Sequence, residues 1–313
     1  GMAEISAPGG CEIGLRPIDL HLSSLRLMGA QIETEGGVLS CRCPDGLRGE
    51  KITLSFPSVG ATENILIAAA SADGETVILN AAREPEIADL ADFLCSCGAH
   101  ISGAGSGEIT VCGMKKLHSA EHTVIPDRII ASTYMAAAAV TGGDVHILDT
   151  RAEHITPVIP VFEQAGCKVD CGENSVHISA PVHLRRVQTV RTMPYPGFPT
   201  DSQAAVMAML SVAHGTSVMI ENIFENRYRH VRELCRLGAD IMTEGKVAVI
   251  KGVETLTGAC VCAADLRAGT ALAVAGLAAQ GSTTIENVCL IDRGWQDMEE
   301  KLRSLGADIR RES

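Results

Sequence analysis

One aspartate stands where a stiff loop meets a predicted helix, and it is the first candidate for chemistry. Asp201 follows a Pro- and Gly-rich stretch at 194–199 and precedes an apolar helix predicted over 202–213. Residues before proline avoid helical backbone angles, so the helix should begin just after Pro199, with Thr200 or Asp201 at or near its N-cap. A carboxylate held at such an end is well placed to act on a ligand, although a simple capping role is the alternative.

A cysteine in a glycine-rich loop is the second candidate. Cys11 directly follows Pro8-Gly9-Gly10. Glycine gives the backbone unusual freedom, so we expect a mobile, exposed loop with the thiol accessible at its tip. A loop cysteine near arginine can have a lowered pKa and act as an acid or a nucleophile. An incidental loop cysteine is the alternative.

Arginines recur at the starts of predicted helices. The segment Arg16-Pro17-Ile18-Asp19-Leu20 opens the first of these helices. A helix N-terminus attracts anions, and a cleft lined by several such ends and by guanidinium groups would bind phosphate and carboxylate. Copying of caps and surface charges between repeats would also explain the pattern. The other arginines at comparable positions are Arg83, Arg128, Arg151, Arg227, Arg267 and Arg293.

Aspartates recur in the same way. Asp127 and Asp265 stand at the starts of their predicted helices and mirror Asp201. Three copies cannot all act as a single catalytic base. We therefore expect two of them to be helix caps or ligand contacts.

Paired cysteines raise the question of a metal site. Cys-x-Cys pairs occur at 41/43, 95/97 and 260/262, and in a strand both sulfurs of a pair would share one face. Neither a histidine nor a further cysteine pair stands at a suitable spacing, so we expect core packing and predict neither a metal nor a cofactor. His118 and His122 lie in a stretch predicted to be extended, and we expect them on the surface.

Composition limits the class of protein. The 313-residue chain has a net charge of −12, which argues against nucleic acid as the main ligand. Its 12 cysteines are scattered, which is typical of a reducing compartment rather than of a disulfide scaffold. Neither a signal-peptide pattern nor an apolar run of membrane length is found. We predict a soluble, cytoplasmic protein without a membrane partner.

Internal repetition is the strongest signal of fold. A predicted helix ends in Gly-Ala or Gly-Cys five times, at glycines 29, 98, 166, 238 and 306, which lie 68 to 72 residues apart. Each glycine is a candidate for the left-handed position that terminates a helix. Four further helices are rich in small residues and apolar nearly all round, so we expect them to be buried, each followed by a strand. These pairs are 60–72 with 75–79, 128–140 with 144–148, 202–213 with 216–220, and 266–279 with 282–285.

The repeat unit is therefore predicted to be strand–helix–strand–helix–hairpin, with buried helices and sheets outside them. Five second halves but only four first halves are present, so we expect the chain to begin inside a repeat and to lack a preceding piece. We predict two domains: an incomplete first domain at 1–125, which carries the cysteine loop, and a second domain of three repeats at 126–313.

Seven motifs stand in order along essentially the whole chain. They are PGGC-x-IG-x-RP-x-DLH at 8–21, PSVGATENI at 57–65, NAAREPEI at 80–87, FPTDSQA at 198–204, IFENRYRH at 223–230, DLRA at 265–268 and IDRG at 291–294. Together they resemble one enzyme family, the UDP-N-acetylglucosamine 1-carboxyvinyltransferases. The resemblance implies repeated βαβαββ units forming two inside-out α/β barrel-like domains. It also implies transfer of the enolpyruvyl group from phosphoenolpyruvate to the 3′-hydroxyl of UDP-N-acetylglucosamine, an early step of peptidoglycan synthesis.

The resemblance also implies roles for individual residues. Cys11 matches the loop cysteine that donates a proton and is alkylated by fosfomycin, and Asp201 matches the aspartate that accepts the proton of the attacking hydroxyl. The alcohol adds to the protonated enol ether and phosphate is then eliminated, which needs an acid, a base and a cationic cradle. The segments that match the nucleotide-sugar site are Arg16, Pro17, Ile18, Asp19, Leu20, Ser58, Val59, Gly60 and Ile223. The arginines that match the phosphate and carboxylate clamp are Arg16, Arg227, Arg267 and Arg293.

The chain departs from the family pattern in one respect. The family's Lys-Asn motif for phosphoenolpyruvate and a further substrate-binding arginine precede the PGGC loop, and neither is present. We therefore expect this chain alone to be weak or inactive, and to need a complementing N-terminal fragment or a homo-oligomer. Two alternatives stay open. One is a non-catalytic nucleotide-sugar-binding or split-enzyme subunit. The other is 3-phosphoshikimate 1-carboxyvinyltransferase, which the PGGC loop and the IFENR run disfavour.

Overall fold

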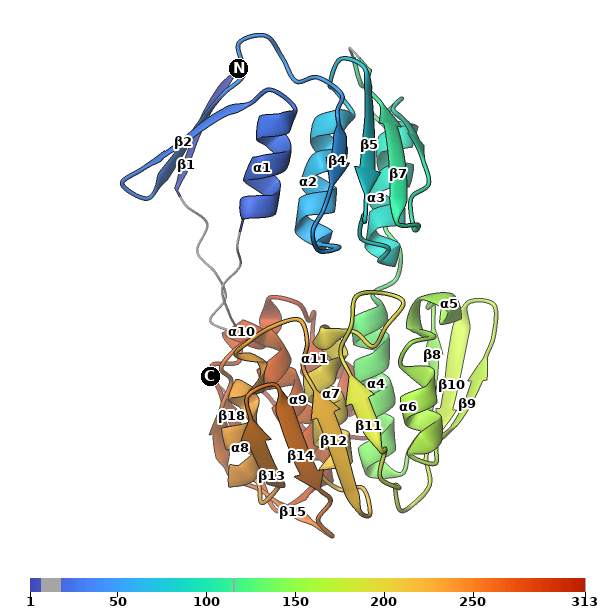
Figure 1. The fold of residues 1–313 in the computed structure, drawn as a ribbon. Helices are drawn as coiled ribbons and strands as arrows, with labels where there is room; N and C mark the ends of the chain where they lie inside the picture. The colour runs from blue at the N-terminus through green and yellow to red at the C-terminus, as the bar shows by residue number, and fades with distance from the viewer. Residues whose placement is uncertain (7–17, 115, 313) are drawn as a thin grey trace. The chain divides into compact units, whose positions relative to one another are not determined.

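The computed structural model describes residues 1–6, 18–114 and 116–312 (Figure 1). The described residues form two compact units. The first comprises the described residues up to Ile125 together with Pro194–Pro196, and the second comprises 126–193 and 197–312. Among the described residues, every helix is too short or too polar to cross a membrane.

The first unit contains two sheets and three helices. One sheet has the order β1-β3-β2 and is antiparallel throughout. The other has the order β4-β5-β7-β6, with only β4 and β5 parallel, and its core includes the fully buried Ile65, Ile78 and Ile109. The elements are β1 (Met2–Ser6), α1 (Asp19–Leu27), β2 (Gln31–Glu35), β3 (Val38–Arg42), β4 (Lys51–Thr53), α2 (Val59–Ala69), β5 (Glu75–Leu79), α3 (Pro85–Ser96), β6 (His100–Ser102) and β7 (Glu108–Cys112).

Three helices form the centre of the second unit: α4 (Arg128–Thr141), α7 (Thr200–Leu210) and α9 (Leu266–Ala278). Each of the three packs on both of the others, and all side chains from Ser202 to Leu210 are buried. Alanine and other small residues make this possible, since the distance between packed helices depends on the side chains at the contact. Ser132 of α4 and Ser202 of α7 meet inside this core, with their hydroxyl oxygens 2.7 Å apart.

Sheets and shorter helices surround the three central helices of the second unit (Figure 1). The sheets have the orders β8-β10-β9, β11-β12-β14-β13, β15-β17 and β16-β18. The elements are β8 (Asp144–Leu148), α5 (Ala152–Ile155), α6 (Ile159–Gln164), β9 (Lys168–Cys171), β10 (Ser175–Ser179), β11 (Thr189–Arg191), β12 (Thr216–Ile220), η1 (Arg227–His230), α8 (Val231–Arg236), β13 (Asp240–Glu244), β14 (Val247–Lys251), β15 (Leu256–Thr257), β16 (Cys260–Cys262), β17 (Ala279–Gln280), β18 (Thr284–Glu286), α10 (Cys289–Asp292) and α11 (Met298–Ser304).

The predicted repeat is confirmed by the backbone. The five glycines that follow the second helix of each repeat all have positive φ angles between 92° and 103°, where a side chain would be strained. The predicted pattern of buried helices with sheets outside them is also confirmed in the second unit. Two predicted helix ends are wrong: α2 ends at Ala69 rather than at residue 72, and α7 ends at Leu210 rather than near residue 213. In both cases the next residues form tighter turns, in which the N–H groups of Ala72 and Ala213 donate three residues back.

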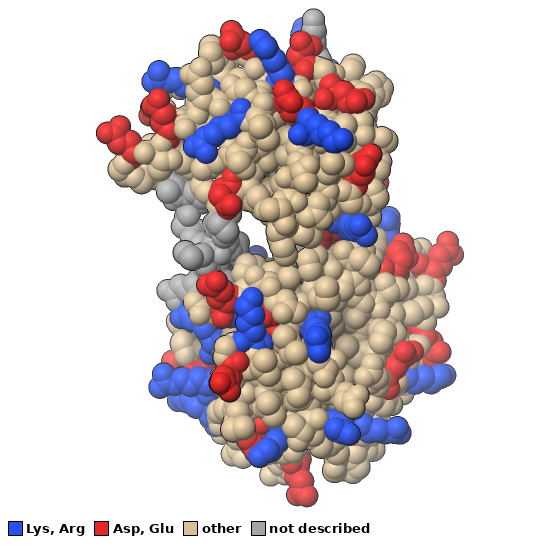
Figure 2. Space-filling model, in the orientation of Figure 1, with Lys and Arg blue, Asp and Glu red and all other residues tan. Residues whose placement is uncertain are grey.

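Charged side chains of both signs are spread over each unit. Figure 2 shows lysine, arginine, aspartate and glutamate interspersed on the visible face, with tan surface between them. This face therefore carries no continuous basic surface of the kind that binds nucleic acid on either unit.

Candidate active site

The starts of the three central helices of the second unit lie together. Asp201 is the second residue of α7, and its carboxylate is hydrogen-bonded by Arg267, the second residue of α9. The positive charge of Arg128, the first residue of α4, also acts on Asp201. The expectation that the helix N-termini with their arginines converge is thus confirmed for this unit. We call this cluster of Asp201, Arg227, Arg267 and the three helix starts the helix-mouth site.

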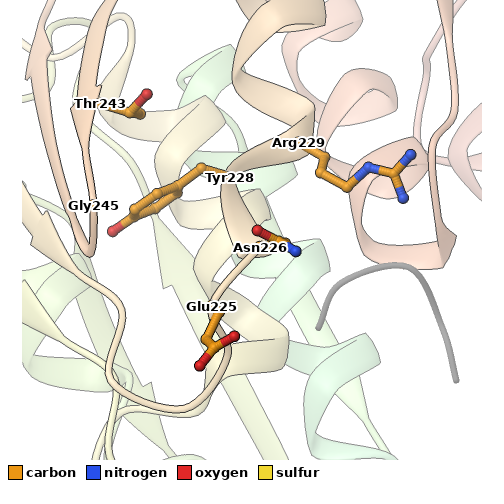
Figure 3. Close-up of a pocket in the computed structure, with 6 residues that line it drawn as sticks. All are labelled: Glu225, Asn226, Tyr228, Arg229, Thr243 and Gly245. Carbon is orange, nitrogen blue, oxygen red and sulfur yellow. The ribbon is translucent and has the colours of Figure 1, made fainter. Parts of the chain in front are cut away.

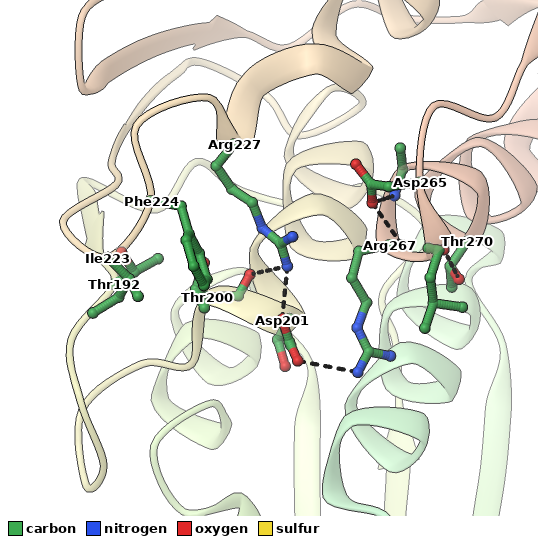
Figure 4. Close-up of polar contacts among 12 residues, drawn as sticks. Thr192, Thr200, Asp201, Ile223, Phe224, Arg227, Asp265, Arg267 and Thr270 are labelled. Carbon is green, nitrogen blue, oxygen red and sulfur yellow. Dashed lines mark hydrogen bonds and ion pairs between the residues drawn. The ribbon is translucent and has the colours of Figure 1, made fainter. Parts of the chain in front are cut away.

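Two guanidinium groups share the carboxylate of Asp201 (Figure 4). Arg227 donates from Nη2 to Oδ1 of Asp201 at 2.7 Å, and Arg267 donates from Nη2 to Oδ2 at 3.1 Å. The same nitrogen of Arg227 lies 3.2 Å from the carbonyl oxygen of Thr200. The side chain of Arg227 is only 3% exposed, whereas that of Asp201 is 42% exposed, so the carboxylate stays open to a ligand while its cationic support is fixed from behind.

The predicted capping role of Thr200 or Asp201 is wrong. The N-cap of α7 is Pro199, and it makes no side-chain capping bond. Asp201 lies two residues further along, and both of its carboxylate oxygens are engaged by arginines instead of by backbone N–H groups. Thr200 donates its hydroxyl to Glu221. A proline at the N-cap therefore leaves the aspartate free for side-chain contacts.

Asp127 and Asp265, by contrast, cap their helices as expected. Asp127 accepts the N–H groups of Ile129 and Ile130 at 2.7 and 3.0 Å. Asp265 accepts the N–H groups of Arg267 and Ala268, both at 2.9 Å. These two aspartates occupy the N-cap itself, so they correspond to Pro199 and not to Asp201. The mirror relation expected from the sequence is off by two residues.

Electrostatics keep Asp201 ionised. Burial alone would raise the pKa of its carboxyl group, but the charges of Arg267 and Arg227, the hydrogen bond from Arg267 and the charge of Arg128 outweigh it, so the pKa lies below its ordinary value. The start of α7 adds a further favourable field for an anion. At neutral pH the helix-mouth site therefore holds a carboxylate between two guanidinium ions.

A buried glutamate that the sequence analysis missed holds the loop beside this site. Glu221 is 1% exposed and accepts four hydrogen bonds, from the hydroxyls of Thr192 and Thr200 and from the N–H groups of Ile223 and Phe224. These contacts join the start of α7 to the loop that leads into η1 and Arg227. The only sequence signal was an acidic residue directly after an apolar strand.

Ile223 and Arg293 were also predicted site residues of the second unit. The N–H of Ile223 is fixed by Glu221 at 2.8 Å, and Figure 4 shows its side chain apart from Asp201. Arg293 is the exposed C-cap residue of α10. Within the described part of the chain, no recorded hydrogen bond or ion pair joins Arg293 to Asp201. The structure thus brings Arg227 and Arg267, but not Arg293, onto the carboxylate.

The remaining predicted residues of the sugar-nucleotide site lie in the first unit. Ile18 is the N-cap of α1, followed by Asp19 and Leu20 in its first turn. Ser58 is the N-cap of α2 and accepts the N–H of Ala61, with Val59 and Gly60 next. The helices α1 and α2 pack together, and a Cβ at Gly60 would lie 3.0 Å from the His21 ring. Two neighbouring helix starts are thus presented together. Cys11, Arg16 and Pro17 lie outside the described residues.

The predicted core role of the Cys-x-Cys pairs is largely wrong. Of these six cysteines only Cys97 is buried, and Cys260 is exposed. Cys95 lies in α3 and Cys97 is its C-cap, so this pair is not in a strand. His118 and His122 are on the surface as expected, and His122 pairs with Asp89 at 2.9 Å.

A separate hollow of about 540 Å³ lies beside the β13–β14 hairpin. Figure 3 shows Tyr228 directed toward Thr243 and Gly245, while Arg229 extends away from them. The Tyr228 hydroxyl lies 3.0 Å from the carbonyl oxygens of both Met219 and Lys246, so this ring fixes η1 against the outer sheet. The hollow shares none of its lining residues with the helix-mouth site.

Comparisons with known proteins agree on the family. A family model described as EPSP synthase (3-phosphoshikimate 1-carboxyvinyltransferase) matches residues 1–302. UDP-N-acetylglucosamine 1-carboxyvinyltransferase 1 of Caldanaerobacter subterraneus subsp. tengcongensis is 54% identical over 311 residues, covering 99% of this chain and 74% of that protein. UDP-N-acetylglucosamine 1-carboxyvinyltransferase of Zymomonas mobilis subsp. mobilis is 51% identical over 312 residues, covering 99% of this chain and 73% of that protein.

The chain belongs to the UDP-N-acetylglucosamine 1-carboxyvinyltransferases. The fold of this chain is shared with other enolpyruvyl transferases of known structure. NikO of Streptomyces tendae superposes with a TM-score of 0.88 at 26% identity, over 99% of this chain and 74% of that one. EPSP synthase of Acinetobacter baumannii, at 24% identity and a TM-score of 0.73 over 97% of this chain and 74% of that one, supports the fold alone. The predicted α/β enolpyruvyl transferase fold is therefore confirmed.

Proposed function

We propose that this chain transfers the enolpyruvyl group of phosphoenolpyruvate to the 3′-hydroxyl of UDP-N-acetylglucosamine, in peptidoglycan synthesis. The observation that carries the proposal is an ionised carboxylate, half open to solvent, held between two guanidinium groups at convergent helix starts. Relatives at about 50% identity over nearly the whole chain bear the name of this reaction.

Asp201 is proposed as the general base. Addition of an alcohol to the enol ether needs a group that removes the hydroxyl proton and one that protonates the methylene carbon. Asp201 is ionised and exposed enough to reach a hydroxyl, and Cys11 is proposed as the acid and as the site of fosfomycin alkylation. The proton leaves the hydroxyl for Asp201 as the C–O bond forms and the methylene carbon is protonated to a methyl group. In the elimination that follows, phosphate departs and the methyl carbon loses one proton, which restores the C=C bond.

Arg227 and Arg267 are proposed to serve two partners in turn. Without substrate they bind the Asp201 carboxylate, which lowers its basicity. Phosphate or carboxylate groups of the substrates match the guanidinium fork and would compete for it. Loss of either contact would return the pKa of Asp201 toward its ordinary value, so anion binding would make Asp201 a stronger base.

The other predicted contacts are kept as proposals. We propose that Arg16, Pro17, Ile18, Asp19, Leu20, Ser58, Val59, Gly60 and Ile223 bind the sugar nucleotide and that Arg16 and Arg293 complete the anion clamp. The paired starts of α1 and α2 support the first of these, since helix starts favour phosphate. We also propose residues 1–125 and 126–313 as the two domains, which the division into compact units after Ile125 supports.

The cytoplasm is the proposed compartment. All eleven cysteines in the described part of the chain are free. Exposed thiols such as Cys112 and Cys289 persist in a reducing environment. Their state supports the same compartment for the reaction.

Substrate-dependent phosphate release tests the function. The chain, alone and mixed with an N-terminal fragment of a relative that carries the Lys-Asn motif, is incubated with phosphoenolpyruvate and either UDP-N-acetylglucosamine or shikimate 3-phosphate. Phosphate and the enolpyruvyl product are followed, the latter by mass spectrometry. We expect release and product only with the sugar nucleotide, and more of both when the fragment is added. Product from shikimate 3-phosphate would assign the other branch of the fold. Tight binding of UDP-N-acetylglucosamine without product or phosphate would favour a non-catalytic binding subunit.

A further inference from the structure

A cluster of histidine and aspartate side chains lies on the outer sheet of the second unit, away from the helix-mouth site in sequence. The antiparallel register of β8, β10 and β9 pairs His177 with His146 on one side and with Asp170 on the other. The rings of His146 and His177 are stacked, with centroids 4.0 Å apart and planes inclined by only 7°. Three strands thus place two imidazoles and a carboxylate in one row.

A second carboxylate completes the cluster. Asp144 lies two residues from His146 on β8, and its Oδ1 is 2.8 Å from Nε2 of His177. One ligating atom each from Asp144, His146 and His177 fits within a spread of 4.8 Å. Oδ2 of Asp170 is 3.7 Å from Nδ1 of the same His177 ring. His177 therefore has a carboxylate near each of its two nitrogens.

We propose that Asp144, His146 and His177 bind one divalent transition-metal ion, with Zn²⁺ as the reference cation. Two imidazole nitrogens and one carboxylate oxygen are a common three-ligand set for Zn²⁺, with water in the fourth position. Asp170 would hold the outer nitrogen of His177 and so orient the ring, as carboxylates do for metal-binding histidines. Asp144 and His146 are exposed, so their side chains can turn toward Nε2 of His177.

Binding would exchange a proton for a metal ion. A hydrogen bond joins Nε2 of His177 to Asp144. Zn²⁺ would take both the nitrogen lone pair and the carboxylate oxygen, and any proton held between them would pass to solvent. No bond other than this hydrogen bond breaks, and no oxidant or reductant is involved.

Other histidines of the chain lack this combination. His183 and His214 also contact each other, but edge to face at 5.2 Å, and they are not part of a recorded metal-ligand group among the described residues. His122 has a carboxylate partner, Asp89, but its ring contacts Phe93, at an interplanar angle of 57°, rather than a second histidine. The pair His183–His214 therefore provides a control for imidazole number without the carboxylates.

Zn²⁺ titration by isothermal calorimetry tests the proposal. Because the chain has exposed cysteines that also bind Zn²⁺, they are first blocked with N-ethylmaleimide. We expect one saturable site in the alkylated chain that carries no substitution. His146→Ala and His177→Ala should each weaken Zn²⁺ binding at least about 100-fold, and Asp170→Asn about 10-fold, the usual cost of losing an orienting partner. The alkylated His183→Ala variant should bind Zn²⁺ as tightly as the alkylated chain without substitutions.

A double variant separates a metal site from a plain ion pair. Equal stoichiometry and affinity in the double variant His146→Ala/His177→Ala would overturn the proposal. So would the absence of any saturable Zn²⁺ binding to the alkylated chain, which would leave the cluster as a hydrogen-bonded surface network.

Discussion

The three central helices of the second unit begin in two different ways. At α4 and α9 an aspartate occupies the N-cap and gives its carboxylate to the helix backbone. At α7 a proline occupies that place, and the aspartate two residues later faces Arg227 and Arg267. The same residue type thus caps a helix at two starts and is held by two arginines at the third, where we propose that it acts as the base.

The difference lies in where the orphan N–H groups at each start are satisfied. An aspartate at the N-cap accepts two of them and is then no longer available. Asp201, at the second helical position, makes no capping bond and gives both carboxylate oxygens to arginines. A displacement of two residues along the chain thus separates a capping carboxylate from the one that we propose as the base.

Removing the charge of Asp201 should have the largest effect on activity of any of these substitutions. Asp201→Asn should lower kcat about 1000-fold, since a positioned general base contributes roughly 10²- to 10⁴-fold. The shape is kept and no capping bond is lost, but Arg227 and Arg267 lose their charged partner, so the thermal midpoint should also fall. Steady-state phosphate release and calorimetric unfolding measure the two effects. Retention of a tenth of the activity would show that Asp201 is not the base.

A buried histidine between the two kinds of helix start should make stability depend on pH. Burial, together with the charge of Arg227, lowers the pKa of His230 to about 4, although nearby Asp265 opposes the shift. The unfolded chain takes up the proton near pH 6.5, so the stability contributed by the neutral ring is lost as pH falls from about 6.5 to about 4. We expect a loss on the order of 3 kcal/mol over this range.

Denaturant unfolding at a series of pH values measures this dependence. His230→Gln should flatten the slope between pH 6.5 and 4, whatever its effect on stability at pH 7. An unchanged slope in that variant would assign the acid sensitivity to other groups. Asp201, whose pKa is lowered, contributes stability above its ordinary pKa that is lost only at still lower pH.

Glu221 should affect the reactive start without touching the substrate. Glu221→Ala removes four hydrogen-bond acceptances and should lower kcat/KM about 10-fold, because Arg227 and the start of α7 lose their common anchor. Glu221→Gln keeps one oxygen for the N–H groups of Ile223 and Phe224, and the Thr200 hydroxyl can turn to accept from the new amide. This variant should recover most of the activity, whereas equal losses in both would point to the charge itself.

Where an aspartate caps the helix, removing it should lower the stability of the fold and leave the activity almost unchanged. Asp127→Ala should destabilise the chain by about 1 kcal/mol, the usual cost of losing an N-cap, and leave kcat within a small factor of its original value. Denaturant midpoints and steady-state rates measure the two effects. A loss of activity comparable to that of Asp201→Asn would mean that the two aspartates do not differ in role.

Periodicity predicted most of the fold. The five left-handed glycines, the apolar all-round helices and strands such as Glu75–Leu79, Asp144–Leu148 and Thr216–Ile220 are where the pattern placed them. Such features depend on residues close together in the chain, so local sequence patterns are enough to predict them. The failures were local as well: a proline was not weighed as an N-cap, and tight turns at the end of α7 were counted as helix.

The site was only partly predictable. Motif resemblance selected Asp201, Arg227 and Arg267, which the structure brings together, but it could not show that the two arginines bind the aspartate itself. Glu221 and the cluster at Asp144, His146 and His177 were missed because their partners are supplied by packing and by strand register. Asp144 and His177 are 33 residues apart, and nothing in their spacing predicts a contact.

The hydroxyl contact between Ser132 and Ser202 affects where the Asp201 carboxylate lies along the axis of α7. Ser202 is adjacent to Asp201, so the 2.7 Å contact clamps α7 against α4 at the level of the mouth. Helices lined with alanine offer few ridges to resist sliding, and a slip of one turn would carry Asp201 about 5.4 Å along the axis, out of reach of both guanidinium groups. The contact with α4 therefore fixes the position of the proposed base along the axis of α7.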